Sequence, residues 1–426
     1  MTDRLIALLG GAEMGQVLRD RSGRLSFHYN KDWQGSPDAY PLSLSMPLAL
    51  SEHGHSKIDA FLWGLLPDNE AVIEAWANRY QVSPRSSFGL IAHVGEDCAG
   101  AVQFVRPEQL PKVRTENRAQ DITWLTEAQV AERLGNLRGD HAAWRSPRDT
   151  GQFSLAGAQP KTALILENGK WGIPSGRIPT THILKPPTGE WDGHSENEHF
   201  CLEVARTLGL TVPNTGVKHF GEETAIVIER YDRTRLEGNL LRLHQEDTCQ
   251  ALGLPPTKKY QNEGGPRVQD IADLLRNHSS RPEEDVWSFL DAVAFNWLIA
   301  GTDAHAKNYS ILIGARGNVR FAPLYDVSSI LPYKNVSIMK AKLAMKIGGI
   351  YRLRYIGGRE WRKLAQEVRV DSDRLVLRMM GFAEALPDFA SEIKRRLNSE
   401  GLSHPLIAKL ADAIAARANQ CHRTLR

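Results

Sequence analysis

The sequence has few cysteines for its length. Only four of its 426 residues are cysteine, namely Cys98, Cys201, Cys249 and Cys421, and no two of them form a Cys-x-x-Cys pair. This spacing excludes zinc-ribbon and thioredoxin-like motifs, and the low density is not that of a disulfide-stabilised secreted domain. We therefore expect free thiols in a reducing, cytoplasmic compartment.

Long hydrophobic runs and compositional bias are also missing. No apolar run approaches the ~20 residues of a membrane span, and the apolar stretch at the N-terminus breaks at Gly10-Gly11, without a convincing signal-peptide pattern. The 35 glycines and 22 prolines are of ordinary abundance, which excludes collagen-like and low-complexity chains. At roughly 150 residues per domain, the length predicts two or three globular domains.

Charge is nearly balanced overall but not along the chain. The net charge is only +3, yet residues 351–426 contain 15 lysines and arginines against 9 acidic residues. A basic segment suits contact with an acidic partner, nucleic acid included. The same composition is typical of a helical bundle with a solvated basic face, so both interpretations stay open. No basic amphipathic anchor is present, and we expect no membrane association.

The first part of the chain predicts a small α+β unit. Residues 16–19 and 25–29 have the pattern of two hairpin strands,. Residues 68–79 have the period of an amphipathic helix, and residues 124–137 have it again,. The polar, charged stretch 112–121 between them is typical of a linker.

The middle of the chain changes to a pattern of strands. Asn168-Gly169 separates the apolar runs 162–166 and 170–173, and an Asn-Gly between two such runs is the strongest short-range signal for a hairpin. Residues 181–185 and 224–229 predict two further strands of the same region.

Helices dominate the rest of the chain. A helix is predicted over 195–208, where Ser195 and Glu198 have the spacing of a capping box,. Residues 282–300 are apolar on most sides and predict a buried helix. Two short strands are predicted for 309–313 and 319–324, and further helices for 360–368, 372–386, 387–397 and 403–418.

This order sets the expected fold class. A strand-rich part, about 150–230, precedes a helix-rich part, about 240–426. We predict an α/β (α+β) fold with two lobes, a small β-rich one and a large helical one, which can hold a nucleotide between them. We expect an N-terminal β-rich subdomain over 1–111, a nucleotide-binding lobe over 112–232 and a helical lobe over 233–426.

The strongest chemical signal is the pair Asp303 and Asn308, which follows the buried helix and precedes a short strand. This is the spacing of a phosphotransferase catalytic loop, in which the Asp accepts the proton of a substrate hydroxyl and the Asn binds a metal that bridges the phosphates. Asp326 ends the next strand pair, where a second metal ligand would lie. Each of the three residues could instead cap a turn, but their combined placement favours a site.

Lys185 ends a strand in an apolar setting, where a lysine can hold the α- and β-phosphates of a nucleotide. It could also extend its amine to water. The helix that follows carries Glu198 and Glu203, either of which could hold the lysine, and the sequence does not choose between them.

The segment Ser154 to Lys161 is rich in small residues, which let backbone N–H groups approach phosphates. It matches neither GxxxxGK[ST] nor GxGxxG, so P-loop NTPases and Rossmann dehydrogenases lose their main support. His305 could contact phosphate or support the catalytic loop. His244 is expected to open a helix, where neighbouring acidic residues suit the N-terminus.

Together these features resemble the HipA family of bacterial toxin kinases. The motifs occur in the family's order and at its spacing, and the likeness covers most of the chain. They are Ser154 to Lys161, Ile183-Leu184-Lys185-Pro186, Asn197-Glu198, Glu229-Arg230-Tyr231-Asp232-Arg233, Leu243-His244-Gln245-Glu246-Asp247, Asp303-Ala304-His305-Ala306-Lys307-Asn308 and Tyr325-Asp326-Val327-Ser328.

The resemblance implies a two-lobed, protein-kinase-like fold and an ATP- and Mg²⁺-dependent phosphorylation of serine or threonine in a protein. The implied target is an aminoacyl-tRNA synthetase, usually the glutamyl enzyme, whose inactivation slows growth. The implied partner is a small, HipB-like helix-turn-helix antitoxin. It neutralises the kinase and represses the operon together with it, which brings the chain to operator DNA.

The resemblance also implies the roles of individual residues. Asp303 would be the catalytic residue, Asn308 and Asp326 would bind Mg²⁺, and Ser154 matches the family's inactivating autophosphorylation site. Glu229 and Tyr231 would offer hinge backbone groups to adenine. The ATP-binding residues implied in full are Ala156, Gly157, Ala158, Gln159, Pro160, Lys161, Lys185, Glu229, Tyr231, His305, Asn308, Tyr325 and Asp326.

Two other functions stay open at this point. The chain could act mainly as a DNA-associated co-repressor with its antitoxin, with incidental ATP binding, and the basic segment 351–426 favours this function. It could also be a kinase of a lipid or a small molecule. A labelled lipid in place of a labelled protein would identify the latter.

Overall fold

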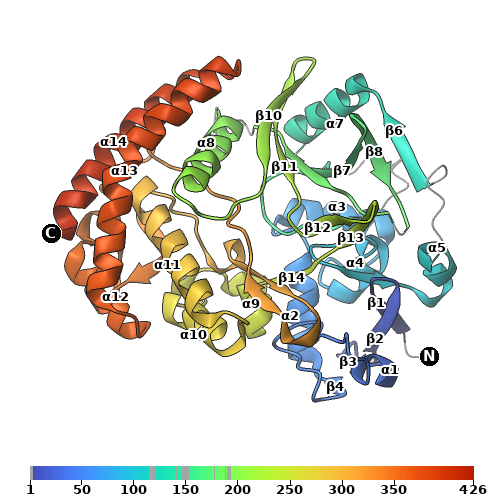
Figure 1. Cartoon of the computed structure of the whole chain (residues 1–426). Coiled ribbons are helices and arrows are strands. Elements are labelled where there is room, and N and C mark those ends of the chain that lie inside the picture. The colour runs from blue at the N-terminus through green and yellow to red at the C-terminus, as the bar shows by residue number, and fades with distance from the viewer. Residues whose placement is uncertain are drawn as a thin grey trace. The chain divides into compact units, whose positions relative to one another are not determined.

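A computed structural model describes residues 3–114, 121–140, 143–144, 153–176, 178–187, 189 and 193–426 (Figure 1). The chain forms two units, each of which is described by itself. Unit 1 contains Met1–Thr188, Lys218–Pro256 and Ile311–Val319, and unit 2 contains Gly189–Val217, Thr257–Ser310 and Arg320–Arg426. The predicted domain boundaries after residues 111 and 232 stay predictions.

Unit 1 begins with a five-stranded sheet in the order β4-β3-β2-β1-β5. The predicted hairpin of 16–19 and 25–29 is confirmed, because β2 and β3 pair antiparallel with Val17 opposite Phe27. The strands are β1 (Asp3–Leu9), β2 (Ala12–Arg19), β3 (Leu25–Tyr29), β4 (Glu52–His53) and β5 (Val102–Val105).

Short helices accompany this sheet. The helix predicted over 68–79 is present as α3, and the Asn69 side chain caps it by accepting hydrogen bonds from the N–H groups of Ala71 and Val72. The elements are α1 (Lys31–Gln34), α2 (His55–Leu65), α3 (Glu70–Tyr80), α4 (Ser87–Val94), the 3₁₀ turn η1 (Pro107–Gln109) and α5 (Leu110–Arg114). The predicted linker 112–121 lies mostly outside the described residues.

The second sheet has six strands in the order β10-β11-β9-β7-β8-β6. Asn168 and Gly169 both have positive φ, 51° and 76°, as the predicted two-residue hairpin turn between β7 and β8 requires. The strands are β6 (Ile122–Leu125), β7 (Thr162–Glu167), β8 (Lys170–Pro174), β9 (His182–Lys185), β10 (Thr215–Phe220) and β11 (Glu223–Glu229).

The helix predicted over 124–137 begins later than expected. Trp124 belongs to β6, which pairs with β8, and the helix α7 runs over Glu127–Gly139. Thr126 caps α7 together with Gln129. Pairing with a distant strand therefore decides the conformation of Trp124, against the local helical period.

A large hydrophobic core lies between the elements of unit 1, beside two smaller clusters in its described part. Its buried members include Phe27 of the first sheet, Phe61 and Ile91 of the helices, and Leu164 and Leu184 of the second sheet. The core is therefore shared by the two sheets, so the N-terminal region packs directly on the strands that carry Lys185. At about 25 cal/mol per Å² of buried apolar surface, contact of this kind dominates the stability of the unit.

Smaller strands follow, and all of their residues except Ser310, Arg320 and Phe321 belong to unit 1. β12 and β13 form a hairpin, and β14 is followed directly by α9, whose first turn is capped by the Asp247 side chain. A three-stranded sheet has the order β14-β15-β16. The bounds are β12 (Arg233–Leu236), β13 (Asn239–Arg242), β14 (His244–Asp247), α9 (Thr248–Leu252), β15 (Ser310–Ile313) and β16 (Val319–Phe321).

Unit 2 is mainly helical. The buried helix predicted over 282–300 is confirmed as α11, and the long helices α13 and α14 run side by side (Figure 1). The helices are α8 (His194–Thr207), α10 (Val268–His278), α11 (Pro282–Ile299), α12 (Gly358–Glu367), α13 (Ser372–Ser399) and α14 (Pro405–Leu425), with the hairpin β17 (Lys342–Ile347) and β18 (Ile350–Arg352).

Two predictions for these helices are wrong. The expected helices 372–386 and 387–397 are one helix, α13, with Pro387 inside it. A proline removes one helical hydrogen bond, and the apolar face on both sides of it, from Leu386 to Ala390, stays buried. The capping box of Ser195 is absent, because α8 begins one residue earlier and its N-cap is Gly193.

Among the described residues, no helix is both long and apolar enough to cross a membrane.

Candidate functional site

The predicted catalytic loop follows a buried helix of unit 2. α11 ends at Ile299, its C-cap Ala300 has a left-handed conformation, and the N–H of Gly301 donates to the carbonyl of Asn296 at 2.7 Å. The chain then reaches Asp303, whose side chain is exposed. A rigid, buried helix thus holds the base of the loop while Asp303 stays accessible.

Hydrogen bonds within the loop explain the spacing of Asp303 and Asn308. The carbonyl of Asp303 accepts from the N–H of His305 at 2.8 Å and from Nδ2 of Asn308 at 2.9 Å. Because the amide nitrogen of Asn308 is used in this way, its Oδ1 faces elsewhere. Among the described residues, this oxygen has no hydrogen-bond donor. The loop therefore presents one carboxylate and one amide oxygen.

A tyrosine that the sequence analysis missed contacts the loop. The hydroxyl of Tyr260 donates to Oδ1 of Asp303 at 2.5 Å, and its ring lies edge-on to His305 with centroids 5.0 Å apart. The His305 side chain is buried. Tyr260 lies 43 residues before Asp303 in the sequence, so no local spacing connects the two.

Tyr325 joins the catalytic loop to the segment that carries Asp326. Its hydroxyl donates to the carbonyl of Lys307 at 2.6 Å and shares a hydrogen bond of 2.7 Å with Ser310. Asp326 is exposed and has a left-handed backbone with φ 58°. Such a conformation is uncommon outside glycine, although Asp and Asn adopt it more readily than other residues.

The segment after Asp326 is held by two helices of unit 2. Asn197 of α8 donates to the carbonyl of Ser329 at 2.8 Å and accepts from its N–H at 2.9 Å. The Ser329 hydroxyl donates to the carbonyl of Ile299, the last residue of α11, at 2.6 Å. Asn197, which the sequence analysis noted only as part of a motif, is therefore a support for the Asp326 segment.

The predicted phosphate loop, Ala156 to Lys161, belongs to the small-residue segment Ser154 to Lys161, which lies in unit 1 and is anchored to the N-terminal region. Ser154 is fully buried, its hydroxyl donates to the carbonyl of Leu65 at 2.7 Å, and its N–H donates to the carbonyl of Asp97 at 2.9 Å. The N–H of Asp68 donates to the carbonyl of Gly157 at 3.1 Å. The start of the small-residue stretch, at Ser154, and its middle, at Gly157, are thus tied to residues of 65–97.

Lys161 closes the same loop. Its ammonium group donates to the carbonyl of Ala156 at 3.0 Å and lies 4.5 Å from the centroid of the Trp144 ring. Gly157 has φ 103°, and a Cβ there would stand 2.7 Å from Nζ of Lys161. The position therefore requires glycine. The stretch from Arg145 to Gly151 that precedes the loop lies outside the described residues.

Lys185 is buried at the end of β9, opposite Ile226 of β11. It belongs to unit 1, whereas Glu198 and Glu203 belong to unit 2, so the structure does not relate the lysine to either. Within unit 2, Glu203 forms ion pairs with Arg206 and Arg396. Glu198 is buried.

The predicted hinge, residues 229–233, contains buried charged side chains that contact Asp97 of the N-terminal region. Asp97 accepts hydrogen bonds from Arg233 at 2.9 Å, Arg242 at 3.2 Å and Arg230 at 3.4 Å, and from the hydroxyl of Thr180 at 2.6 Å. Burial alone would raise the pKa of Asp97, but the three guanidinium charges outweigh burial and hold this pKa well below its usual range,. Asp97 is therefore ionised.

The hinge backbone itself is fixed from both sides. Glu229, the exposed last residue of β11, pairs with His182, and the N–H of Arg230 donates to the carbonyl of Thr181 at 2.9 Å. The Tyr231 hydroxyl bonds to Gln245. Asp232 is buried and accepts from the N–H of Gly100 at 2.7 Å. The two hinge residues predicted to contact adenine thus sit on a backbone braced by buried polar contacts.

His244 does not open a helix, which corrects the sequence-based expectation. It begins strand β14 and is buried, and the helix begins after Asp247. Burial lowers the pKa of His244 to about 4, so the ring is neutral at pH 7,. Its Nε2 bonds to the carbonyl of Leu42 at 2.9 Å, and its Nδ1 accepts from the N–H of Ala101 at 3.4 Å. This histidine is a packing residue.

Glu246, from the same motif, is a buried acid. Its Oε1 accepts from the N–H of Leu44 at 2.7 Å, and its Oε2 has no partner among the described residues. Burial raises the pKa of Glu246 to about 8. The protonated form of Glu246 is therefore favoured in the folded chain. Its contribution to the free energy of unfolding is fully present below about pH 4.5, the pKa of the group in the unfolded chain, and is lost as the pH rises through about 8,.

We expect Glu246→Gln to remove this pH dependence. The variant and the wild type should be about equally stable near pH 5, and the variant should be more stable by on the order of 4 kcal/mol at pH 9. Urea unfolding at both pH values measures the difference. Glu222→Gln, at an exposed loop position, is the matched control and should show no such trend. Equal stability of Glu246→Gln and wild type at pH 9 would contradict the buried-acid interpretation.

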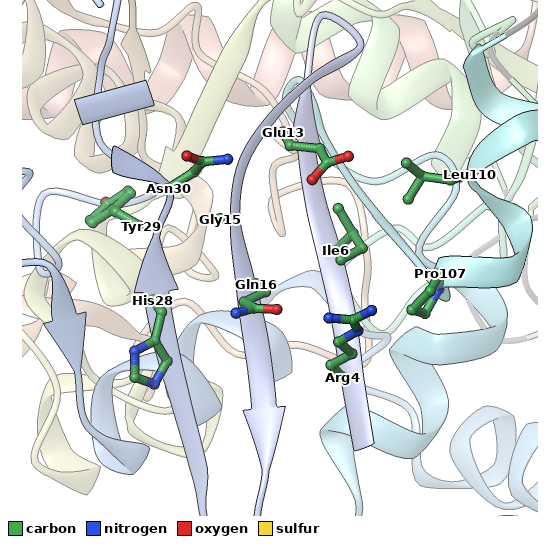
Figure 2. A pocket seen from close by; sticks show the side chains of 10 residues that line it. All are labelled: Arg4, Ile6, Glu13, Gly15, Gln16, His28, Tyr29, Asn30, Pro107 and Leu110. Carbon is green, nitrogen blue, oxygen red and sulfur yellow. The ribbon is translucent and has the colours of Figure 1, made fainter. Parts of the chain in front are cut away.

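A cavity of about 300 Å³ lies on the N-terminal sheet (Figure 2). It is lined by side chains of β1, β2 and β3 and by two residues of the segment after β5. None of the predicted site residues lines it. Its polar side chains include Arg4, Glu13, Gln16, His28 and Asn30.

Comparison with known proteins identifies the family of the chain. Residues 153–390 match the HipA-like C-terminal domain, and residues 5–105 match the HipA N-terminal domain. The chain belongs to the HipA family of serine/threonine kinases. The C-terminal match contains every site residue predicted from the sequence. The N-terminal match contains Leu65, Asp68 and Asp97.

Several relatives of this HipA-family chain are known. It is 35% identical over 413 residues to "Putative kinase Y4mE" of Sinorhizobium fredii, covering 96% of both chains. It is 30% identical over 356 residues to the serine/threonine-protein kinase toxin HipA of Shewanella oneidensis, covering 80% of this chain and 77% of the other. The solved complex of Shewanella oneidensis HipA with HipB and operator DNA contains a chain with TM-score 0.83 and 26% identity, covering 99% of this chain and 98% of that one.

Proposed function

We propose that this HipA-family chain transfers the γ-phosphoryl group of ATP to a serine or threonine hydroxyl of a protein. The observation that carries the proposal is the loop from Asp303 to Asn308, in which the Asn308 amide holds the carbonyl of Asp303 while the Asp303 carboxylate stays exposed. An exposed, fixed carboxylate can accept the proton of an acceptor hydroxyl as the oxygen attacks phosphorus.

The other predicted residues would bind and orient the nucleotide. Lys185 would hold the α- and β-phosphates, and the backbone of 156–161 would surround the β- and γ-phosphates. Glu229 and Tyr231 would offer backbone groups to adenine. His305 and Tyr325 would complete the site, His305 toward the phosphates and Tyr325 by holding the Lys307 carbonyl.

The residues present fit a magnesium ion. Asn308 Oδ1 has no donor among the described residues, and Asp326 is exposed, so an amide oxygen and a carboxylate, both hard ligands, are offered. No group of three or more His, Cys, Asp or Glu able to hold a metal occurs in the described part of the chain. Mg²⁺ usually takes one or two protein ligands and fills its shell with phosphates and water. When bound, it would neutralise the charge that develops on the phosphates.

We further propose that the chain is the toxin of a HipBA-like module in the cytoplasm. The neighbour in the solved complex is bound with HipB and operator DNA, which supports a helix-turn-helix antitoxin as partner and contact with DNA through it. Part of the positive charge of 351–426 is already neutralised within unit 2, because Arg378 pairs with Asp291 and Arg396 pairs with Glu203. The exposed basic residues of 351–426 that form no such ion pair in the described part of the chain would be those available for DNA.

The proposed substrate is an aminoacyl-tRNA synthetase, with the glutamyl enzyme as the first candidate. The test incubates the purified chain with the purified synthetase, labelled ATP and Mg²⁺, with excess EDTA in a parallel reaction. Label on a synthetase serine or threonine, lost with EDTA, supports the proposal. Label on another protein of a lysate, with none on the synthetase, would keep the kinase and reject this substrate.

The burial of Ser154 leads to a prediction about self-inactivation. A phosphate adds about two negative charges, which cannot stay in a fully buried position facing the Leu65 carbonyl. We expect Ser154→Ala to remove autophosphorylation while transfer to other proteins continues, at a cost of about 1–2 kcal/mol in unfolding free energy for the lost hydrogen bond.

Mass spectrometry of the chain after incubation with ATP, together with urea unfolding, checks this prediction. Ser87→Ala is the matched control, because Ser87 is also buried in unit 1 and donates to Asp59, yet lies outside the phosphate loop. It should keep the label on Ser154. Undiminished self-labelling of Ser154→Ala would show that another residue is the acceptor.

A further inference from the structure

The segment before α10 packs on the catalytic loop. The carbonyl of Lys259 accepts from the N–H of Ala306 at 3.2 Å, and the carbonyl of Tyr260 accepts from the N–H groups of Glu263 and Gly265, both at 3.0 Å. A Cβ at Gly265 would stand 2.3 Å from the carbonyl oxygen of Lys258, so only glycine fits. The backbone around Tyr260 is therefore fixed by close local contacts.

A second anchor holds the same segment to β17. The Gln261 side chain accepts from the N–H of Lys346 at 2.7 Å. With Lys259 bonded to the catalytic loop on one side and Gln261 bonded to β17 on the other, the side chain of Tyr260 is held at its base. Its ring lies edge-on to the buried His305 ring, which limits how far it can swing.

The two oxygens of the Asp303 carboxylate have different surroundings. Oδ1 accepts from the Tyr260 hydroxyl at 2.5 Å. In the described part of the chain, Oδ2 has no hydrogen-bond partner, and the Asp303 side chain is exposed. An O–H donor to a carboxylate is a charge-assisted bond, among the stronger hydrogen bonds in proteins.

We propose that Tyr260 is a positioning residue that orients the Asp303 carboxylate so that Oδ2 faces the acceptor hydroxyl. The inference rests on the proposed function, because it assigns to Tyr260 the orientation of the group that accepts the proton. During transfer, the acceptor O–H bond breaks and its proton goes to Asp303, the acceptor oxygen bonds to the γ-phosphorus of ATP, and ADP leaves. Tyr260 keeps its own proton throughout.

Removal of the Tyr260 hydroxyl tests the proposal. Tyr260→Phe keeps the ring against His305 and removes the hydroxyl that donates to Asp303. We expect kcat for phosphoryl transfer to fall about 10- to 100-fold, the range for one charge-assisted hydrogen bond, while the KM for ATP stays within about twofold. The melting temperature of the variant should change little. Tyr355→Phe, at an exposed tyrosine of unit 2, is the control and should transfer phosphate at the wild-type rate.

A double-mutant cycle separates positioning from a merely structural role. In an Asp303→Ala background, Tyr260→Phe should have no further effect on kcat, because its partner is gone. Additive losses in the cycle would overturn the proposal and assign Tyr260 to the packing of the loop.

Two further outcomes would also overturn it. A faster rate for Tyr260→Phe would mean that the tyrosine competes with the acceptor for Asp303, and an unchanged kcat would mean that the contact has no role in transfer. Absence of transfer by the wild-type chain is a different result, since it rejects the proposed function itself. If the wild type transfers phosphate and the variants show additive losses, a faster rate or an unchanged kcat, only the role of Tyr260 is rejected.

Discussion

Asp303→Ala is expected to reduce phosphoryl transfer by roughly 10²–10⁴-fold, the usual contribution of a positioned general base. The side chain is exposed, and among the described residues its one hydrogen-bond partner is Tyr260. Its removal should therefore leave the fold and the binding of ATP intact. The loss lies in the chemical step, because Asp303 is the one carboxylate in residues 303–308 and its side chain is exposed.

The measurement is the initial rate of label incorporation into Ser154 or another acceptor, with the melting temperature of each variant recorded alongside. Asp388→Ala, at an exposed aspartate of α13, is the matched control and should keep full activity. If Asp303→Ala melts far below wild type with activity per folded molecule unchanged, Asp303 is a structural residue.

Asp97→Ala is expected to lower the unfolding free energy by about 3–5 kcal/mol, the effect of removing one partner of a buried ion pair. Buried Arg230 and Arg233 and partly buried Arg242 would lose a carboxylate, while Asp232 would still pair with Arg230 and Arg233. The loss should be felt mainly by the hinge, because alanine keeps the backbone carbonyl of residue 97 that accepts from the N–H of Ser154.

The same carboxylate predicts an acid-dependent loss of stability. The pKa of Asp97 is held below its unfolded value of about 3.8, so its contribution is present above that pH and is lost as pH falls through the folded pKa. Urea unfolding between pH 3 and pH 7 measures both effects. The wild type should lose stability at the acid end more steeply than Asp97→Ala.

The control is Asp3→Ala, which removes a surface ion pair with Arg19. Exposed pairs of this kind contribute little to stability, so the variant should unfold like the wild type. A cost below about 1 kcal/mol for Asp97→Ala would contradict the account of the buried network.

Features set by neighbouring residues were predictable from the sequence. The turn at Asn168-Gly169 needs two residues that tolerate positive φ, and both have it. A buried helix over 282–300 was predictable because the segment is apolar on most sides, and α11 is buried along most of its length. Asp303, Asn308 and Asp326 were singled out because their types and spacing are local. The hydrogen bonds of the loop explain the spacing of Asp303 and Asn308. The catalytic role of Asp303 and the metal-binding roles of Asn308 and Asp326 stay predictions.

Features set by distant residues were not predictable. Trp124 lies in a strand because β8 pairs with it. The N-cap of α8 is Gly193, where His404 and Leu406 leave no room for a Cβ. Tyr260 meets Asp303 across 43 residues. Asp97 meets Arg242 across 145 residues. No single-sequence pattern relates such pairs, since they are brought together only by the folded chain.

Whether this HipA-family chain is a protein kinase that uses Asp303 can be decided in a single labelling experiment. The purified chain is incubated with γ-labelled ATP, Mg²⁺ and a bacterial lysate, in parallel with Asp303→Ala, and labelled products are separated as protein and lipid. The account predicts label on the chain and on one further specific protein, at serine or threonine, both absent with Asp303→Ala. Label in lipid alone, or no label although ATP raises the melting temperature of the chain, would contradict it.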